Sequence, residues 1–309
     1  MLGPYVPDLV SLQLLLAVRT TGSLSAASAH AAMTQQGASS RMQAMETQVG
    51  VALLTRTTQG SQLTTSGQLL AQWAETVIDA ASVLEAGIVS LRIDRDGLLR
   101  VFASLTVAEH LMPRWLVALQ TQRRAAGEPP AAIKLVATNS DAVLAAVTEG
   151  QAALGFVEGP GVPAGLRSRP IGRDQLQVVV APRHPWARRR APVPAAELAA
   201  TALVSREPGS GTRRALTRAL SAHLPRGTPL AAPVLELSSS AAVRASIAAG
   251  VGPGVLSALT VADDISLGRL VVVDLADVDL RRTLRAVWAA GRQPPAGPAR
   301  ALLSLAIRA

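Results

Sequence analysis

The feature that most constrains this chain is a single run of apolar and small residues that begins at residue 70. These residues recur in alternating steps of three and four over three heptads: Leu70, Trp73, Val77, Ala80, Leu84, Gly87 and Leu91. Just before them, Thr65-Ser66-Gly67-Gln68 fits a capping box, in which the Thr hydroxyl and the Gln side chain satisfy backbone donors at a helix start. The spacing predicts one long helix over 66–96 with the seam of a coiled coil. An amphipathic helix packed on its own domain is the alternative interpretation.

The 65 residues before this helix have short helical patterns with clear start and stop signals. A first apolar run over 9–18 is broken by Gly22, and Ser23 can cap a second helix over 24–31. Thr34 can cap a third helix that ends at Gly50. Two β-prone runs, 53–55 and 62–64, follow as a hairpin. The sequence therefore predicts a winged helix-turn-helix over 1–65, whose second motif helix would present side chains to the DNA major groove.

Candidate DNA contacts lie at the starts of the two motif helices and on the hairpin. They are Ser23, Thr34, Gln35, Gln36, Ser39, Ser40, Arg41, Gln43 and Arg56. Glutamine can bond adenine in a bidentate manner and serine can bond several bases, whereas Arg41 and Arg56 would hold phosphates. A solvated polar helix face is the alternative, because residues 1–66 carry a net charge of only +1.

After Gly97 the pattern changes to short apolar strands that alternate with helices. The strand-like runs cover 98–103, 133–137, 153–157, 176–181, 202–204, 234–237, 251–256, 270–275 and 284–288. Alternation of this kind predicts an α/β fold with parallel strands, and ligands bind such sheets where strand ends meet helix N-termini. We expect two α/β lobes with a cleft between them over 97–309.

Composition excludes several classes of function. The chain has no cysteine and 2% aromatic residues, so thiolate metal sites and aromatic base-stacking platforms are not expected. Its four histidines form no metal-binding pair, no motif of an enzyme or of a cofactor site is present, and no secretory or membrane segment stands out. We therefore expect a cytoplasmic protein that is not an enzyme and has neither metal nor cofactor.

Positive charge is concentrated outside the predicted DNA-binding domain. The chain has a net charge of +9, carried by arginines and one lysine, Lys134. Residues 167–226 hold twelve Arg against three acidic residues. Such a span suits an anionic partner, although an arginine-rich proteome can also produce it.

These motifs together resemble the LysR-type transcriptional regulators. The resemblance is carried by Gly22-Ser23-Leu24, Thr34-Gln35, Met45-Glu46, Leu53-Leu54-x-Arg56 and Leu63-Thr64, then Ala103-Ser104-x-Thr106, Val157-Glu158-Gly159-Pro160 and 206–213. The later motifs are similar to the branch associated with sulfur and carbon assimilation. Ser40 and Gln59 stand where family members commonly carry Arg, so fewer phosphate contacts are expected. A solute-binding module without a DNA role is the alternative.

The resemblance implies operator binding by a homodimer or a homotetramer, with a small-molecule effector in a periplasmic-binding-protein-like domain of two lobes. Residues at the strand-to-helix turns are the candidate effector ligands: Ser104, Thr106, Asn139, Ser140, Gly209, Ser210, Gly211, Thr212, Ser238 and Ser239. Several converging helix N-termini would favour a small anion. For each hydroxyl alone, an ordinary helix cap is the alternative.

Overall fold

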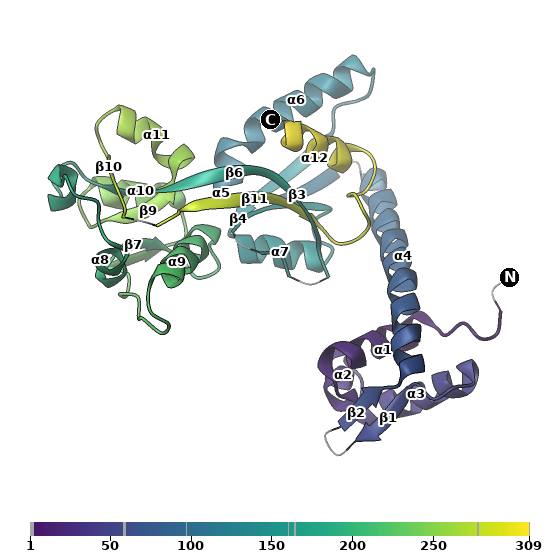
Figure 1. Cartoon of the computed structure of the whole chain (residues 1–309). Helices are drawn as coiled ribbons and strands as arrows, with labels where there is room; N and C mark the ends of the chain where they lie inside the picture. Colours follow the sequence, from purple (N-terminus) through teal and green to yellow (C-terminus); the bar gives the residue numbers. More distant parts are fainter. Residues whose placement is uncertain are drawn as a thin grey trace. The chain divides into compact units, whose positions relative to one another are not determined.

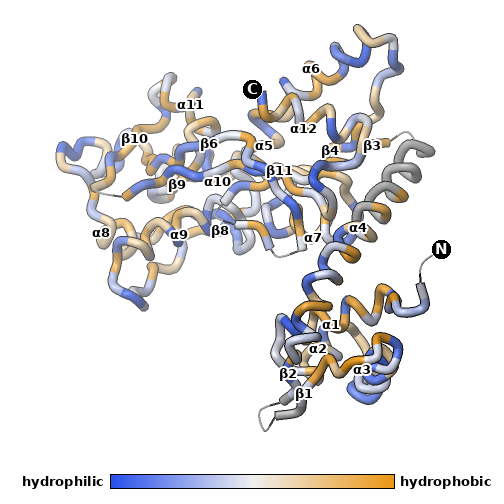
Figure 2. Tube along the Cα trace, turned by 45° about the vertical axis from the view of Figure 1, so that its right-hand side comes forward, coloured by the Kyte–Doolittle hydropathy of each residue, from blue (hydrophilic) through white to orange (hydrophobic). Residues whose placement is uncertain are grey.

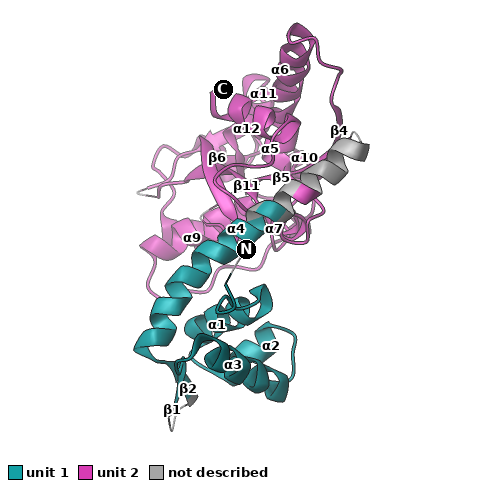
Figure 3. Cartoon of the chain, turned by 90° about the vertical axis from the view of Figure 1, so that its right-hand side faces the viewer, with its two compact units in different colours: residues 1–85 teal, residues 86–309 magenta. Residues whose placement is uncertain are grey.

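The computed structural model describes residues 3–57, 60–96, 98–159, 161–163, 165–276 and 278–308. It divides into two compact units, residues 1–85 and residues 86–309 (Figures 1 and 3). Helix α4 (Thr65–Asp96) begins in the first unit and ends in the second. Among the described residues, no helix is long and apolar enough to cross a membrane.

The first unit contains the three helices and the hairpin that the sequence predicts: α1 (Leu9–Thr21), α2 (Leu24–His30), α3 (Gln35–Val49), β1 (Leu54–Thr57) and β2 (Gly60–Leu63). The predicted caps are confirmed, since Ser23 and Thr34 accept hydrogen bonds from Ala26 N and Gly37 N. Gly22 and Gly50 end α1 and α3 in the left-handed conformation, at φ 67° and 82°. The motif is a winged helix-turn-helix.

The predicted capping box at Thr65 is wrong by one residue. Thr64 is the cap, because its Oγ1 accepts from Gly67 N at 3.0 Å. Thr64 is fixed there by the hairpin, since its hydroxyl also donates to Ala52 O at 2.8 Å and its N–H donates to Leu53 O at 2.9 Å. With Thr64 as the cap, the third helical position, where a capping box has Glu or Gln, is Gly67. A Cβ at Gly67 would lie 2.2 Å from Leu53 O. Tertiary contacts of the hairpin therefore set the helix start.

Helix α4 packs on the core of the first unit by one side only. Its Ala71 and Ala74 are buried in the cluster that also holds Leu12, Leu15, Val18, Ala27, Met42 and Met45, coloured orange where apolar in Figure 2. Of the predicted seam, Leu70 is half-buried, and Trp73, Val77 and Leu84 are 60%, 40% and 65% exposed. The side chain of Leu91 and the surroundings of Gly87 lie outside the described part. The seam therefore forms an exposed apolar stripe along α4.

The second unit is built on one sheet with the strand order β4-β3-β5-β11-β6-β9-β7-β8, with β10 paired to β6. We call the part around β3 (Leu98–Ser104), β4 (Ala132–Thr138) and β5 (Leu154–Glu158) lobe I. Lobe II surrounds β7 (Val204–Arg206), β8 (Leu235–Leu237), β9 (Gly254–Ser257) and β10 (Val271–Val273). Strands β6 (Arg167–Val180) and β11 (Arg281–Trp288) join the lobes.

The expectation of parallel strands is correct only within each lobe. Strands β3, β4 and β5 are parallel, as are β7, β8 and β9, but β6, β10 and β11 pair antiparallel. The sequence predicts only the second half of β6, because residues 167–170 are exposed and give no apolar run. Strand direction is not encoded in hydrophobic runs of this kind.

Helices cover both faces of the sheet in each lobe (Figure 1). In lobe I, α5 (Leu105–His110), α6 (Met112–Ala125) and α12 (Pro298–Arg308) share one core, and α7 (Ser140–Thr148) packs in a separate one. Lobe II holds α8 (Ala195–Ala200), α9 (Gly211–His223), α10 (Ser240–Ala248), α11 (Ala258–Ser266) and the 3-10 turn η1 (Pro185–Arg188). Strands β3, β4, β7, β8 and β9 each lead into a helix N-terminus. The predicted ligand residues lie at these turns.

Candidate DNA interface and effector site

Helix α3 has one apolar face and one polar face. Ala38, Met42 and Met45 are buried at steps of four and three, and they anchor α3 in the core of the first unit. Four of the predicted DNA contacts on α3 are exposed, namely Gln35, Gln36, Ser40 and Gln43. A fifth, Ser39, is half-buried. The amide and hydroxyl groups at the start of α3 are therefore free to meet an external surface. Their contacts with DNA stay predictions.

The turn between α2 and α3 is short. It runs over residues 31–34, and Ala32 adopts a φ of 50°. That conformation is unfavourable for a residue with a Cβ. Ser23 and Thr34 use their hydroxyls as caps at the two ends of the motif, so the helix N-termini are fixed in place.

Of the two arginines predicted to hold phosphates, Arg41 already has partners, and the side chain of Arg56 lies outside the described part. Arg41 donates to Asp8 Oδ1 at 2.9 Å and to Ser11 Oγ at 3.3 Å. The Ser11 hydroxyl, helped by Ser11 N–H and the Arg41 charge, lowers the pKa of Asp8 despite partial burial. Arg41 thus supports the N-terminus of α1. Arg56 lies on β1, and its side chain, like all of Gln59, is outside the described part.

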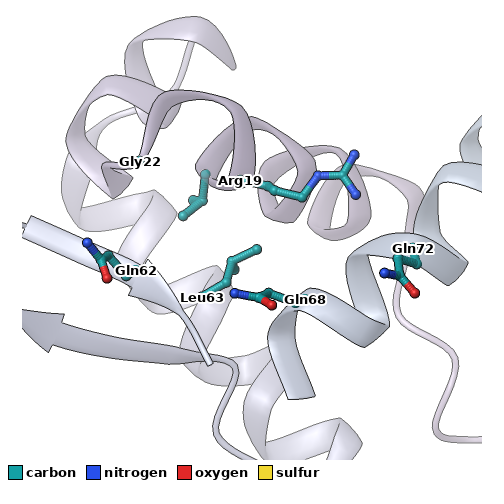
Figure 4. Close-up of a pocket in the computed structure, with 7 residues that line it drawn as sticks. Arg19, Gly22, Gln62, Leu63, Gln68 and Gln72 are labelled. Atoms are coloured by element: carbon teal, nitrogen blue, oxygen red, sulfur yellow. The ribbon is translucent and has the colours of Figure 1, made fainter. Parts of the chain in front are cut away.

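A groove of about 420 Å³ in the first unit was not foreseen from the sequence (Figure 4). It lies between the end of α1, strand β2 and the first turns of α4, and its lining comprises Val18, Arg19, Gly22, Gln62, Leu63, Gln68 and Gln72. Arg19 is ion-paired with Glu75 of α4. Glu46 Oε1 accepts from the N–H groups of Leu53 and Leu54 at 2.7 and 2.9 Å, which fixes the hairpin to α3. These contacts fix the direction of α4 relative to α3 inside the first unit.

In the second unit, two predicted effector ligands, Thr106 and Thr212, bond to a buried arginine that the sequence analysis missed. Arg282 of β11 is 2% exposed and pairs with two buried carboxylates, Asp174 at 2.7 Å and Glu158. Its guanidinium also donates to Thr212 Oγ1 at 2.9 Å and to Thr106 Oγ1 at 3.1 Å. Thr106 belongs to lobe I and Thr212 to lobe II. One guanidinium therefore links the two lobes.

Two other predicted ligands, Ser140 and Gly211, contact Glu158, and a third, Ser104, has no hydrogen bond among the described residues. Ser140 Oγ donates to Glu158 O at 3.2 Å. At Gly211 a Cβ would lie 2.3 Å from Glu158 O, so only glycine permits this approach. Ser104 is 1% exposed, and its Oγ has no hydrogen-bond partner among the described residues. A buried hydroxyl of this kind is uncommon, since such groups are normally paired.

The remaining predicted ligands lie in a second network or outside both. Asn139 caps α7 and donates to Glu207 Oε1 of lobe II at 3.1 Å, while Gly209 O accepts from Asp141 N at 3.3 Å. Ser239 caps α10. Ser210 takes the N-cap position of α9 without a side-chain bond, and Ser238 is exposed.

Arg206 belongs to this second network. It is 3% exposed and makes two bonds to Glu207, at 2.8 and 2.9 Å, and one to Ser240 Oγ at 2.9 Å. Burial alone would raise the pKa of Glu207, but the bonds and charge of Arg206 outweigh it, so the pKa is lowered. Arg213 is likewise paired with Glu236. Neither guanidinium is uncompensated.

A sequence signal for the missed cluster does exist. Arg282 begins an alternating inward stripe that continues as Leu284, Ala286 and Trp288, all buried. Asp174 begins the corresponding stripe of β6 with Leu176, Val178 and Val180. The register places Arg282 opposite Asp174. An acidic and a basic residue at the starts of two alternating apolar runs are therefore candidates for a buried ion pair.

Together, a capped recognition helix in the first unit and a two-lobed α/β body in the second define a class of protein: a regulator that joins DNA binding to ligand sensing on one chain. The model of the bacterial regulatory helix-turn-helix of the lysR family matches residues 9–68, and that of the LysR substrate binding domain matches residues 93–309.

Relatives and solved structures agree with this class. The chain is 48% identical over 303 residues to the HTH-type transcriptional regulator Rv2282c of Mycobacterium tuberculosis, covering 98% of this chain and 97% of that one. It is 31% identical to YeiE of Escherichia coli, covering 88% and 86%. The CcmR regulatory domain of Synechocystis, solved with 2-PG, has a TM-score of 0.58 at 25% identity, covering 68% and 96%. Full-length OxyR of Pseudomonas aeruginosa shares the fold, with a TM-score of 0.53 at 19% identity over 98% and 100%.

The chain belongs to the LysR family of transcriptional regulators. It is a DNA-binding regulator with an effector-binding domain, and the family is not one of enzymes. Neither the family models nor these relatives single out the sulfur and carbon assimilation branch.

Proposed function

We propose that this regulator reads its operator through the neutral polar face at the start of α3 and responds to a small anion held between lobes I and II. The observation that carries the first part is that Gln35, Gln36 and Gln43 are exposed on a helix whose opposite face is anchored in the core. Two glutamine amides in the first turn suit bidentate bonds to adenine. Ser23, Ser39 and Ser40 then contact bases or phosphates beside them.

The exposed stripe of α4 supports assembly into a homodimer, or a homotetramer of two such dimers. Trp73, Val77 and Leu84 offer large apolar side chains at coiled-coil spacing, and burial of each stabilises a helix pair by about 1.5–3 kcal/mol. A dimer would present its two α3 helices to half-sites about 34–36 Å apart.

The anion proposal rests on the groups that surround Glu158. The Arg282 guanidinium is the centre of this region, and the first turn of α9 brings Gly211 and Thr212 against Glu158. Helix N-termini and a guanidinium both favour negative charge. Asp174 and Glu158 already supply two carboxylates to Arg282, so an anionic effector would have to compete with the Glu158 carboxylate for the guanidinium. The likeness to a domain solved with 2-PG supports a small-molecule ligand of this kind.

DNA recognition is tested by fluorescence anisotropy with the DNA upstream of the chain's own gene. The double variant Gln35→Ala and Ser39→Ala should lower specific affinity by at least tenfold, because a good bidentate base contact contributes about 1–3 kcal/mol. Gln13→Ala, an exposed glutamine on α1, is the matched control. Unchanged specific affinity of the folded double variant would remove α3 from base recognition.

The effector is tested by calorimetry with sulfite, sulfate, thiosulfate and small carboxylates. We expect heat from at least one of them, and loss of that heat in the variant Thr212→Val, which removes a hydroxyl beside Arg282. Thr201→Val, whose hydroxyl bonds only its own helix, is the control. Heat from none of these anions would refute the anion proposal and leave DNA binding intact. Ligand binding without any operator binding would instead favour a solute-binding module.

A further inference from the structure

The arginines of the span 167–226 are not used by the DNA and effector sites proposed above. These arginines include four in ion pairs among the described residues: Arg189 with Glu197, Arg206 with Glu207, Arg213 with Glu236 and Arg214 with Asp141. Among the rest, Arg183, Arg188 and Arg190 lie within eight residues of one another. All three are exposed, and none is in an ion pair with the described residues.

These three arginines project from an ordered segment, residues 182–192, which includes η1 and joins β6 to α8. The segment is the teal-green turn at the left edge of Figure 1. His184 Nδ1 accepts from Trp186 N at 3.1 Å, and Trp186 Nε1 donates to Glu197 Oε1 at 3.1 Å. Arg189 donates to the same oxygen at 2.6 Å. The segment is therefore fixed on its inner side, while its other arginines remain in solvent.

Local charge remains positive when nearby acids are counted. Glu197 is the acid bound to the segment, and the exposed Asp274 is joined to its end through a hydrogen bond from Val193 N to the Asp274 carbonyl. Four arginines over 183–190 against these two acids leave a balance of +2. The ordered backbone reduces the conformational entropy lost when such side chains bind a partner.

We propose that Arg183, Arg188 and Arg190 form a second DNA contact that holds the phosphate backbone without reading bases. The guanidinium group matches phosphate geometry and keeps its charge at all physiological pH values. The proposal also accounts for the shortage of uncompensated positive side chains in the first unit, where the described arginines, Arg19 and Arg41, are both in ion pairs.

An acidic protein surface is the less suitable partner, because the segment offers no apolar anchor. Its exposed residues are proline, arginine and alanine, whereas Trp186 is half-buried and bonded to Glu197. Protein interfaces depend on a few large side chains buried at their centre. Phosphate binding requires only cations and the release of counterions from the DNA.

The test is the salt dependence of binding by the full chain to a 40-base-pair duplex of random sequence. The triple variant R183Q/R188Q/R190Q is compared with the wild type and with R169Q/R173Q/R226Q. The control removes three exposed arginines of the same span that, among the described residues, are in no ion pair. Association constants are measured by anisotropy between 50 and 200 mM salt.

Each phosphate contact contributes about 0.9 to the slope of log K against log salt concentration. For each chain that contacts the duplex, the first variant should therefore lower the slope by about 2.7, so that the wild type loses about 40-fold more affinity than the variant over this fourfold range. The control should keep the wild-type slope. Equal slopes for all three proteins would overturn the proposal, as would an equal fall in both variants. Altered transcription of the target gene with an unchanged slope would overturn it in favour of a protein partner.

The outcome is separable from that of base recognition by α3. The duplex has no operator, so Gln35→Ala should leave its binding unchanged whether or not Gln35 reads bases. Circular dichroism of each triple variant checks that the fold is retained.

Discussion

Replacing Arg282 by Met removes the positive charge from a cluster in which two carboxylates face one guanidinium. The side chains of Arg282, Asp174 and Glu158 are each 2% exposed, so solvent does little to screen the charges that remain. Loss of one partner from a buried ion pair costs about 3–5 kcal/mol, because the other charge is left uncompensated. Thr106 and Thr212 also lose their donor. We expect Arg282→Met to lower the free energy of unfolding of the second unit by about 3–5 kcal/mol.

The matched variant is Glu158→Gln, which takes the cluster from a net charge of −1 to neutral and preserves shape. It should cost less than about 2 kcal/mol, since a neutral acceptor replaces a charged one. Urea denaturation followed by the fluorescence of Trp115 and Trp288, both buried in lobe I, measures the two losses. A loss below about 1 kcal/mol for Arg282→Met, or an equal loss for both variants, would refute the assignment of net negative charge to this cluster.

Three further changes test local features. Ala32→Gly should raise the unfolding free energy of the first unit by about 0.5–1 kcal/mol, because Ala32 has a φ of 50°, and a fall in denaturation midpoint would contradict this. Gly211→Ala should lower stability by about 1–3 kcal/mol, since its Cβ would lie 2.3 Å from Glu158 O, whereas Gly172→Ala, with open space around it, should be neutral in the same urea titration. Burial lowers the pKa of His184 below 6.5, so neutral His184 stabilises the fold above pH 6.5 and that contribution is lost as pH falls through its lowered pKa. The difference in unfolding free energy between the wild type and His184→Ala should therefore shrink from pH 8 to pH 5. A difference that widens over this range would contradict the lowered pKa of His184.

Local signals were sufficient for the three helices and the hairpin of the first unit, with the cap of α4 as an exception. Ser23 and Thr34 are identified as caps because a cap depends on residues within one helical turn. Thr64 was missed for a tertiary reason, since its bonds to Ala52 and Leu53 come from the hairpin. The polar face of α3 follows directly from the buried stripe on its other side.

The site in the second unit was only half predictable. Thr106 and Thr212 stand out as hydroxyls after strands, and the structure brings both to Arg282. Arg282 itself and Asp174 are 108 positions apart, and only the pairing of β11 with β6 places them together. No local window contains that register, because it is set by the antiparallel crossing of two strands between the lobes.

The position of Arg282 also limits how much free energy an effector can transmit. Under the proposed function, the hydroxyls of Thr106 in lobe I and Thr212 in lobe II, whose oxygens accept from Arg282, would donate their own hydrogens to the anion. Hydrogen bonds to charged groups contribute about 1.5–3 kcal/mol each, so two such bonds to the anion contribute about 3–6 kcal/mol. A shift of a two-state equilibrium from 1:99 to 99:1 requires about 5.5 kcal/mol of differential affinity. An effector that engages both threonines therefore reaches the range of a full switch, whereas one that engages a single threonine supplies half of it and produces only a graded response.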